Sequence, residues 1–305
     1  MHVFVTGASG FVGSAVVREL LGAGHEVVGM ARSDESAASL KEAGAEVHRG
    51  DLDDLDSLRA GAAASEGVIH TAYVHDFRDF AEAARTDLRA VEATGEALAG
   101  SGHPLLICSG TAFSPGVLAT EDNPGDPSRS HMYRLASETA VMRLAERGGR
   151  ASVVRLPPST HGEGDHGFVP LLIDIARAKG VSAYPSAGTN RWATTHRFDA
   201  ARLFRLALES APAGTRLHAV AEEGVPVREI AEAIGRGLGV PVRSIPAEET
   251  QDHFGWLGNF FALDLPASSA VTREGLGWEP VETGLLADLE AGHYFGSAGG
   301  GTEAS

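Results

Sequence analysis

The sequence predicts an α/β fold, with a Rossmann-type doubly wound parallel sheet and a smaller, partly interleaved C-terminal lobe. Two observations carry this prediction. Short apolar runs alternate with helical patterns through the first half of the chain, which is the rhythm of a parallel sheet covered by helices on both faces. A glycine-rich loop also stands directly between the first apolar run and the first helical pattern, as it does in folds of this class.

The first domain is expected to span residues 1–155. Its predicted strands are the apolar runs at residues 2–5, 26–30, 46–49, 67–70, 104–108 and 151–155. Helical periodicity fills the intervals, at residues 11–21, 33–43, 55–62, about 77–99 and 131–147. The last strand, 151–155, is expected to complete the sheet.

The second half of the chain begins with an irregular stretch rich in proline and glycine. Helices are predicted at residues 169–178, 199–209, 227–238 and 285–292, with a short strand at 242–245. We expect residues 156–192 and 219–295 to form a substrate-binding lobe, and a segment at about 193–218 to return to the first domain. The small-residue tail at 296–305 is expected to be disordered.

The charge of the chain limits the kinds of partner that it can bind. The 305-residue chain has 25 Lys and Arg against 41 Asp and Glu, a formal charge of −16. Such a charge repels nucleic acid and anionic lipid, so a small-molecule partner is expected. The only cysteine, Cys108, excludes an intrachain disulfide, and its apolar strand indicates a packing role. With no signal peptide and no apolar run of about 20 residues, the expected location is the cytoplasm.

The loop after the first strand has the residues that a phosphate-binding turn needs. Gly7 permits a sharp turn, Gly10 permits close approach of a pyrophosphate, and Gly13 permits close packing of helix against strand. The following helix N-terminus offers free N–H groups to phosphate. The expected cofactor contacts from this loop are Gly7, Ser9, Gly10, Phe11, Val12 and Gly13.

The spacing of these glycines, T-G-x-x-G-x-x-G, resembles that of the extended and atypical short-chain dehydrogenases/reductases, the NAD-dependent epimerase/dehydratase type. The resemblance covers nearly the whole chain. It implies a nicotinamide dinucleotide cofactor, and extended members of the family often form homodimers through the helices that correspond to residues 77–99 and 131–147 here.

The end of the second strand favours NADP(H) over NAD(H). Arg32 stands where an NAD enzyme usually has an acidic residue for the ribose, and its guanidinium can pair with a 2′-phosphate. Ser33 can add a hydroxyl donor. The alternative is that Arg32 is an ordinary surface arginine and that Asp34 binds the ribose.

Two further segments resemble cofactor-binding parts of the family. Asp51 and Leu52 resemble the pair that holds adenine, although Asp51 is also a candidate N-cap for a helix over 52–58. After the fourth strand, Thr71, Ala72 and Tyr73 resemble the segment that passes the cofactor ribose, with Tyr73 in place of a small residue.

The family resemblance also supplies the catalytic candidates. Thr111, with Ser109 as a second candidate, stands at the hydroxyl position that polarises a carbonyl; both could also be simple turn hydroxyls. Tyr133 and Ser137 stand at the tyrosine and lysine positions of Y-x-x-x-K. Because an unassisted tyrosine is a poor base at pH 7 but still a proton donor, the missing lysine favours reduction over oxidation. Arg134 is a candidate for the missing charge.

The loop after the sixth strand adds Pro157 and Pro158, which resemble the family's loop under the nicotinamide, and His161, a candidate auxiliary proton donor. The spacing around His161 does not suit a metal, and no G-x-S-x-G hydrolase motif is present. The substrate pocket is expected between the lobes. Its candidate lining is aromatic: Tyr73, Phe168, Trp192, Phe254, Trp256, Phe260 and Phe261.

These residues lead to one functional hypothesis and two rivals. The hypothesis is an NADPH-dependent reductase that transfers hydride to a carbonyl or a conjugated C=C or C=N bond of an apolar small molecule. The rivals are a non-catalytic NADP-binding regulator and a sugar-nucleotide epimerase or dehydratase, the latter disfavoured by the missing lysine.

Overall fold

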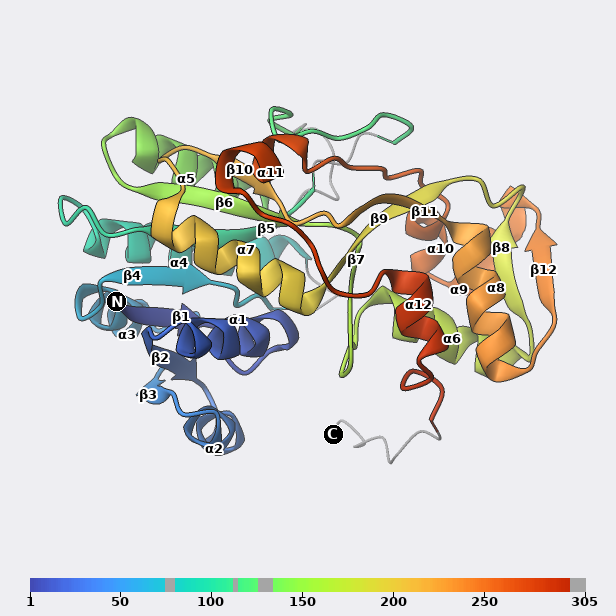
Figure 1. Ribbon diagram of the computed structural model, residues 1–305, viewed down its shortest axis with the longest axis horizontal. Coiled ribbons are helices and arrows are strands. Elements are labelled where there is room, and N and C mark those ends of the chain that lie inside the picture. The colour runs from blue at the N-terminus through green and yellow to red at the C-terminus, as the bar shows by residue number, and fades with distance from the viewer. Residues whose placement is uncertain (75–79, 112–114, 126–133, 297–305) are drawn as a thin grey trace.

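The computed structural model describes residues 1–74, 80–111, 115–125 and 134–296. Within them the chain has the predicted α/β architecture, built on a parallel seven-stranded sheet in the order β10-β6-β5-β4-β1-β2-β3 (Figure 1). The strands are β1 (His2–Thr6), β2 (Glu26–Ala31), β3 (Glu46–Arg49), β4 (Gly67–His70), β5 (Leu105–Gly110), β6 (Ala151–Leu156) and β10 (Arg216–His218). The tail for which disorder is predicted lies outside the described residues from position 297 on.

Helices cover both faces of this sheet. One face carries α1 (Phe11–Gly22), α2 (Asp34–Glu42) and α7 (Arg197–Ser210), and the other carries α3 (Leu55–Ala63), α4 (Phe80–Ala97) and α5 (Leu135–Glu146). Successive side chains of β1 alternate between the faces: Val3 and Val5 pack under α1 and α7, and Phe4 packs under α3. All three are fully buried, because a parallel sheet with two covered faces needs apolar residues at both phases.

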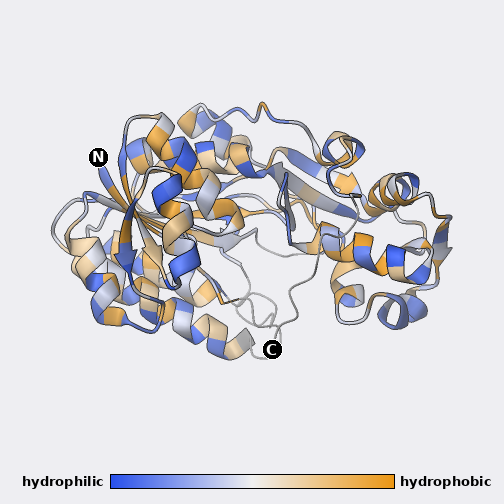
Figure 2. Ribbon diagram, turned by 90° about the horizontal axis from the view of Figure 1, so that it is seen from below, coloured by the Kyte–Doolittle hydropathy of each residue, from blue (hydrophilic) through white to orange (hydrophobic). Residues whose placement is uncertain are grey.

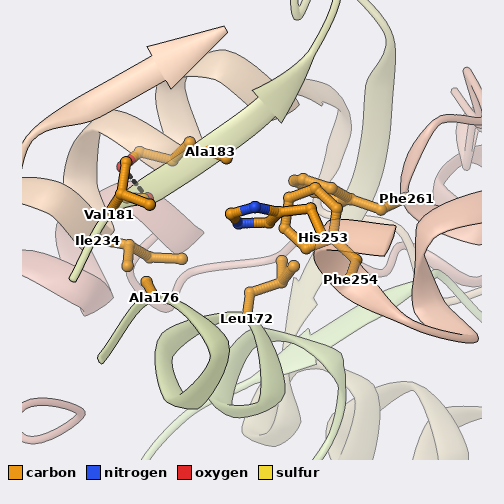
Figure 3. A pocket seen from close by; sticks show the side chains of 10 residues that line it. Leu172, Ala176, Val181, Ala183, Ile234, His253, Phe254 and Phe261 are labelled. Atoms are coloured by element: carbon orange, nitrogen blue, oxygen red, sulfur yellow. Dashed lines mark hydrogen bonds between the residues drawn. The ribbon is translucent and has the colours of Figure 1, made fainter. Parts of the chain in front are cut away.

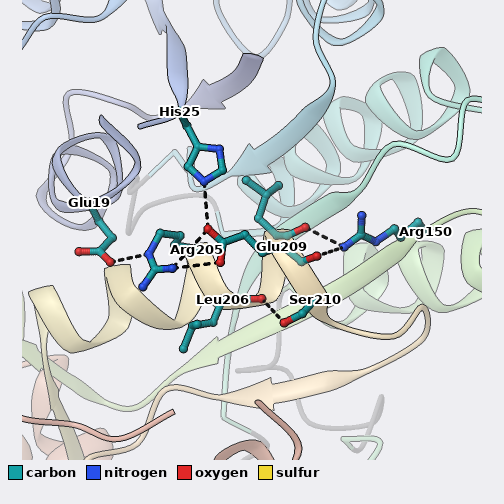
Figure 4. A network of polar contacts seen from close by, with 8 residues as sticks. Glu19, His25, Arg150, Arg205, Leu206, Glu209 and Ser210 are labelled. Carbon is teal, nitrogen blue, oxygen red and sulfur yellow. Dashed lines mark hydrogen bonds and ion pairs between the residues drawn. The ribbon is translucent and has the colours of Figure 1, made fainter. Parts of the chain in front are cut away.

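A polar network fastens α7 to α1 and to the loops before β2 and β6 (Figure 4). Arg205 donates to Glu19 of α1 at 2.7 Å and pairs with Glu209 one turn further along α7. Glu209 also lies 3.0 Å from His25. Arg150 donates to the carbonyls of Leu208 and Glu209, which are among the helix-end acceptors without an intrahelical partner. These contacts hold the C-terminal half of α7 against α1.

The second lobe has two small sheets and its own core. β7 (Ser159–His161), β9 (Arg191–His196) and β11 (Glu222–Pro226) form one sheet, and β8 (Ser182–Pro185) pairs with β12 (Val242–Ile245) in the other. Around them lie α6 (Phe168–Lys179), α8 (Val227–Leu238), η1 (Ala247–Glu249), α9 (Thr250–Phe254), α10 (Leu257–Phe261) and α12 (Leu285–Glu290); α11 (Ala270–Leu276) packs on α7 and β10 instead. Figure 2 shows apolar residues gathered inside each lobe.

The long elements lie close to their predicted positions, and the differences fall on short ones. The sheet has a seventh strand, β10, that was not predicted, and α7 and β10 lie with the main sheet, whereas β9 belongs to the second lobe. The helix predicted over 52–58 as an alternative begins at Leu55. Strands β7, β8, β9 and β11 were also missed, because runs of three to six residues without regular alternation carry little local signal.

The core of the second lobe has a small cavity. Its volume is about 10 Å³, it lies between α6, α8, β8 and α9, and it is just large enough for one water molecule. Figure 3 shows the His253 ring among the apolar side chains that line this cavity, and His253 Nε2 is buried without a hydrogen-bond partner in the described part of the chain. A cavity of this size cannot hold a substrate. Among the described residues, no helix is both long and apolar enough to cross a membrane.

Candidate cofactor and active site

The glycine loop between β1 and α1 is packed so tightly that two of its glycines are obligatory. Gly7 has a φ of +66°, and a Cβ there would lie 2.6 Å from the backbone nitrogen of Ala72. A Cβ on Gly13 would lie 2.0 Å from the carbonyl oxygen of Gly7. The loop therefore lies directly on the segment after β4, at the point where the strand order reverses, which is where open α/β sheets bind ligands.

The first turn of α1 is open to an anion. Gly10 is the N-cap residue, no side chain caps the helix, and the first turn has no acidic residue. Ser9 and Gly10 are exposed, while Phe11 and Val12 are half-buried. The free N–H groups and the helix dipole at this end suit a phosphate. The cradle that the glycines leave therefore fits the phosphates of a dinucleotide.

Arg197, which the sequence did not reveal, ties the second lobe to this turn. Its guanidinium carbon lies 4.7 Å from the centre of the Phe11 ring. It donates to Ser14 Oγ and to the carbonyl oxygen of Glu163, both at 2.9 Å. His166 packs edge-on against the same Phe11 ring, with its centroid 5.8 Å away. The loop after β7 is thus fastened to the start of α1.

The three polar residues after β2, Arg32, Ser33 and Asp34, have different contacts. Ser33 is the N-cap of α2, and its hydroxyl accepts from the backbone nitrogen of Ser36. Asp34 pairs with Arg49. Arg32 is exposed and makes no ion pair within the described residues. Among the described residues, Asp34 is already paired with Arg49, whereas Arg32 has no ion-pair partner. Arg32 is therefore the better placed of the two candidates for the ribose.

Asp51 does not cap a helix over 52–58. Its Oδ1 accepts from the backbone nitrogens of Asp53 and Asp54, at 2.9 and 3.0 Å, and so closes a turn. Asp54 is the N-cap of α3 and accepts from Ser57. Leu52 is buried against the sheet. The alternative that Asp51 caps a helix was wrong, because its carboxylate closes a turn before the helix and Asp54 caps the helix instead.

The segment after β4 faces the glycine loop. Thr71 donates its hydroxyl to the carbonyl of Thr6 at 2.8 Å, and Ala72 lies against Gly7. The half-buried Tyr73 has the guanidinium carbon of Arg134 4.9 Å from its ring centre. The predicted aromatic lining residue is therefore held by a cation from the start of α5.

At the end of β5, Ser109 and Thr111 are both nearly enclosed, with 6 % and 2 % of their surface exposed. The backbone nitrogen of Thr111 donates to the carbonyl of Leu156 at 2.9 Å, which holds it beside the end of β6. Burial raises the pKa of the Cys108 thiol, so Cys108 stays protonated and suits the packing role predicted for it. Pro157, buried, and Pro158, half-buried, follow β6.

The hydroxyl of Ser137 is bonded within the protein and is not free for a cofactor ribose. It is fully buried in α5 and donates to Asp87 Oδ2 of α4 at 2.5 Å. Arg134, the N-cap of α5, donates to Asp87 Oδ1 at 3.0 Å. Tyr133, the predicted proton donor, lies outside the described residues, so its part in the site stays a prediction.

Asp87 is the centre of a buried polar cluster that the sequence did not reveal. It is fully buried and accepts from His70 Nε2 at 3.1 Å as well as from Arg134 and Ser137. Burial opposes its ionisation, but the Arg134 charge and the hydrogen bonds from His70 and Ser137 outweigh this and hold the pKa of the Asp87 carboxyl well below its usual range. Asp87 is therefore a carboxylate at pH 7.

The cluster continues to the glycine loop. With Nε2–H donating to Asp87, His70 Nδ1 accepts from the Thr6 hydroxyl, 2.8 Å away. Thr6 Oγ1 in turn accepts from the backbone nitrogen of Ala72 at 3.4 Å. A continuous chain of hydrogen bonds thus joins the strand beneath the cofactor cradle to the first turn of α5.

A second buried cluster anchors α5 to the sheet. Glu138 accepts from Arg155 of β6 through both carboxylate oxygens and from Arg216 Nε of β10 at 2.6 Å. Arg155 is fully buried and lies 3.3 Å from His218. Burial and the Arg155 charge lower the pKa of His218 to about 4, so His218 is neutral at pH 7. Because Glu138 follows Ser137, this cluster also sets the position of Ser137 on α5.

His161 is joined to the C-terminal segment. It is 1 % exposed, and its Nδ1 lies 2.8 Å from Asp288 Oδ2. Its ring packs edge-on against His196, with centroids 5.3 Å apart. Among the residues that the structure describes, no contact joins His161 to Ser109 or Thr111, and no group of three or more His, Cys, Asp or Glu could hold a metal ion.

Some of the aromatic residues predicted to line the substrate pocket are buried in the core of the second lobe, and others lie at its surface. Trp192 is fully enclosed, and Phe254 and Phe261 are 5 % and 1 % exposed, so these three belong to the core of the second lobe. Trp192 as a substrate contact was therefore wrong: as a buried strand residue it packs on Phe168 and on the rings of α10. Trp256 is 50 % exposed and packs on Phe168, with centroids 6.2 Å apart. Trp256 is thus the most exposed of the candidate lining residues.

The sequence of this chain is similar to a known protein family and to proteins of other organisms. A model of the NAD dependent epimerase/dehydratase family matches residues 3–220. The chain is 50 % identical to an uncharacterized protein of Schizosaccharomyces pombe, over 97 % of this chain and all of the relative. The family match covers all seven strands of the main sheet except the first residue of β1.

More distant relatives have named activities. The chain is 28 % identical to a UDP-glucose 4-epimerase of Streptomyces lividans, over 96 % of this chain and 95 % of the relative. It is also 28 % identical to a 2-alkyl-3-oxoalkanoate reductase of Stenotrophomonas maltophilia, over 79 % and 77 %. A crystal structure of dTDP-glucose 4,6-dehydratase from Streptomyces venezuelae with NAD and TYD bound shares the fold, with a TM-score of 0.75, 19 % identity and coverage of 97 % and 96 %.

Proposed function

The chain belongs to the NAD dependent epimerase/dehydratase family, and on this premise we propose that it is an NADPH-dependent reductase of an apolar small molecule. The observation that carries the proposal is Ser137, buried against Asp87 at the position of the family's lysine. Reduction needs a proton donor, and a tyrosine at pH 7 is one without assistance. Oxidation of an alcohol needs a base, which a tyrosine without the lysine does not provide.

The residues that would hold NADPH are those of the cradle. Gly7, Gly10 and Gly13 with the first turn of α1 would bind the pyrophosphate, Arg32 the 2′-phosphate, and Thr71 and Ala72 would lie along the ribose. Bound NADPH supplies a hydride. Asp51 and Leu52, beside β3, remain the candidates for the adenine, and Pro157 with Pro158 for the nicotinamide side.

The chain's own chemistry would then be the handling of one proton. Thr111, fixed by the hydrogen bond from its backbone nitrogen to Leu156, would donate its hydroxyl proton in a hydrogen bond to the oxygen or nitrogen of the acceptor. Tyr133 would transfer its phenolic proton to that atom. Trp256 and Phe168, at the edge of the second lobe, would exclude water from the acceptor.

Consumption of NADPH with a panel of ketones, enones and imines tests the proposal directly. Turnover with one class names the bond that is reduced. If NADPH binds but no acceptor is reduced, the non-catalytic regulator replaces the reductase, since the missing lysine also suits a protein that only senses NADP(H). Interconversion of UDP-glucose and UDP-galactose would instead indicate the epimerase that one relative is named for.

Replacing Arg32 by alanine is expected to weaken NADPH binding and to leave NADH binding unchanged. Arg32 is exposed and has no ion-pair partner within the described residues, so its charge is available to a 2′-phosphate. A charge-assisted hydrogen bond contributes about 1.5–3 kcal/mol, so the NADPH dissociation constant should rise about 10- to 100-fold. Fluorescence titration with both cofactors measures this.

Arg49→Ala is the matched control, because Arg49 is already paired with Asp34 on the neighbouring helix. Equal affinity of the wild-type protein for NADH and NADPH would remove the preference for NADP(H).

We also propose that the protein is a homodimer through α4 and α5, which lie side by side on one face of the sheet. The support is the family resemblance, together with the prevalence of two-fold dimers. Light scattering at micromolar concentration should return twice the chain mass of 31.7 kDa; a single chain mass would contradict the proposal.

A further inference from the structure

A cation shares the Asp87 carboxylate with Ser137, the residue at the lysine position of Y-x-x-x-K. Arg134 stands at the start of α5, directly after Tyr133 in the chain, and only 16 % of its side chain is exposed. Its guanidinium donates to Asp87 Oδ1 at 3.0 Å. A charge that is this buried would be costly without a fixed counterion, and Asp87 is that counterion.

Asp87 is built to hold Arg134 in one place. The Asp87 carboxylate is fully buried and takes hydrogen bonds from three directions: from His70 of β4, from Arg134 and from Ser137 of α5. Each donor leaves the carboxylate fewer orientations, so the position of Arg134 depends on the whole cluster. Ser137 therefore serves as one of the donors that orient Asp87, and it brings no charge of its own.

The Arg134 guanidinium also contacts the segment that follows β4 beside the glycine loop. Its carbon lies 4.9 Å from the centre of the Tyr73 ring. Its Nε is buried without a hydrogen-bond partner among the described residues. The ionisable groups that act on it are Asp87 of α4, Cys108 of β5 and Tyr73, with His70 of β4 bound to Asp87.

We propose that Arg134, fixed by Asp87, is the positioning residue that supplies the positive charge of this site in place of the missing lysine. A cation held here stabilises the negative charge that develops on a neighbouring phenol while its proton passes to an acceptor. Because the Asp87 carboxylate balances the Arg134 charge, the pair assists proton donation but does not hold the phenol as a base in the way an unpaired lysine does. The proposal rests on the reductase function for its catalytic consequence, but the charge effect itself exists without turnover. Tyr73, whose contact with Arg134 is described, reports it directly.

The test is a spectrophotometric titration of tyrosinate in the protein without added cofactor. The chain has four tyrosines, and the difference between each protein and its Tyr73→Phe counterpart isolates Tyr73. Removing the cation with Arg134→Gln should raise the pKa of Tyr73, and removing the counterion with Asp87→Asn should lower it, each by about one unit. A purely structural role for the pair would shift both variants in the same direction.

The same variants are then followed in the reduction. Arg134→Gln should lower kcat while leaving the KM for NADPH nearly unchanged, and Asp87→Asn should move the limb of the kcat profile that reports the proton donor to lower pH. Arg134→Lys keeps the charge, so its Tyr73 pKa and its kcat should stay close to those of the wild-type protein. If Arg134→Gln does not fold, Arg134→Lys and Asp87→Asn together still test the proposal.

Arg205→Gln is the matched control, because Arg205 is a comparably buried, ion-paired arginine in the α1–α7 contact. It should lower stability without moving the Tyr73 titration. Shifts of the same sign in Arg134→Gln and Asp87→Asn, or none in either, would overturn the proposal. If no acceptor is ever reduced, the reductase function fails, while opposite shifts of Tyr73 would still establish the cation.

Discussion

Replacing Tyr133 by phenylalanine is expected to lower the turnover of the reduction by about 10²- to 10⁴-fold, the usual contribution of a general acid. The affinity for NADPH should stay nearly the same, because the residues of the cradle lie on other elements: the glycine loop, β2 and the segment after β4. The measurement is kcat under saturating NADPH, with the dissociation constant of NADPH determined separately.

Tyr184→Phe provides the matched control. Tyr184 lies on β8 of the second lobe, where its ring has the Arg228 guanidinium carbon 5.8 Å from its centre, so its hydroxyl should not affect turnover. Full activity in Tyr133→Phe would move the proton donor to another group. Tyr73, beside Arg134, and His161, bound to Asp288, would be the next candidates.

The structure also changes what a lysine at position 137 is expected to do. Family resemblance alone suggests that Ser137→Lys would create alcohol oxidation. Because Ser137 is fully buried and bonded to Asp87, a lysine there would meet the same carboxylate as Arg134 and compete with it. Tyr133→Phe is therefore the cleaner test of the chemistry.

The largest expected effect on stability comes from the cluster beneath α5. Glu138→Gln should lower the free energy of unfolding by about 3–5 kcal/mol, the usual result of removing one partner from a buried ion pair. Glu138 is 1 % exposed, and the substitution leaves the fully buried Arg155 without its counterion. Urea unfolding at pH 7 measures the difference.

Glu232→Gln is the corresponding control on the surface. Glu232 pairs with Arg228 within α8, and the two side chains are 37 % and 57 % exposed. Exposed pairs of this kind contribute well under about 1 kcal/mol. If Glu138→Gln cost no more than Glu232→Gln, the buried cluster would not be what holds α5 on the sheet.

What the sequence determined by itself is local. The first strand, the glycine loop and the first helix follow from residues that are neighbours in the chain, since Gly7, Gly10 and Gly13 meet a single strand–turn–helix geometry. The first six strands of the main sheet follow from short continuous apolar runs, and its helices follow from apolar residues with a period of about 3.6. These signals predicted the fold and the phosphate cradle, and the comparisons confirm the fold and the family.

What only the tertiary structure decided are the contacts between charges far apart in the sequence. Asp87 meets Arg134 and Ser137 across 47 and 50 residues, and Glu138 meets Arg216 across 78. No periodicity marks these residues, because a buried charge is defined by its partner and not by its neighbours in the chain. The sequence therefore pointed to a missing lysine, and the packing of α4 against α5 decided that Ser137 faces Asp87 and that Arg134 lies beside Tyr73.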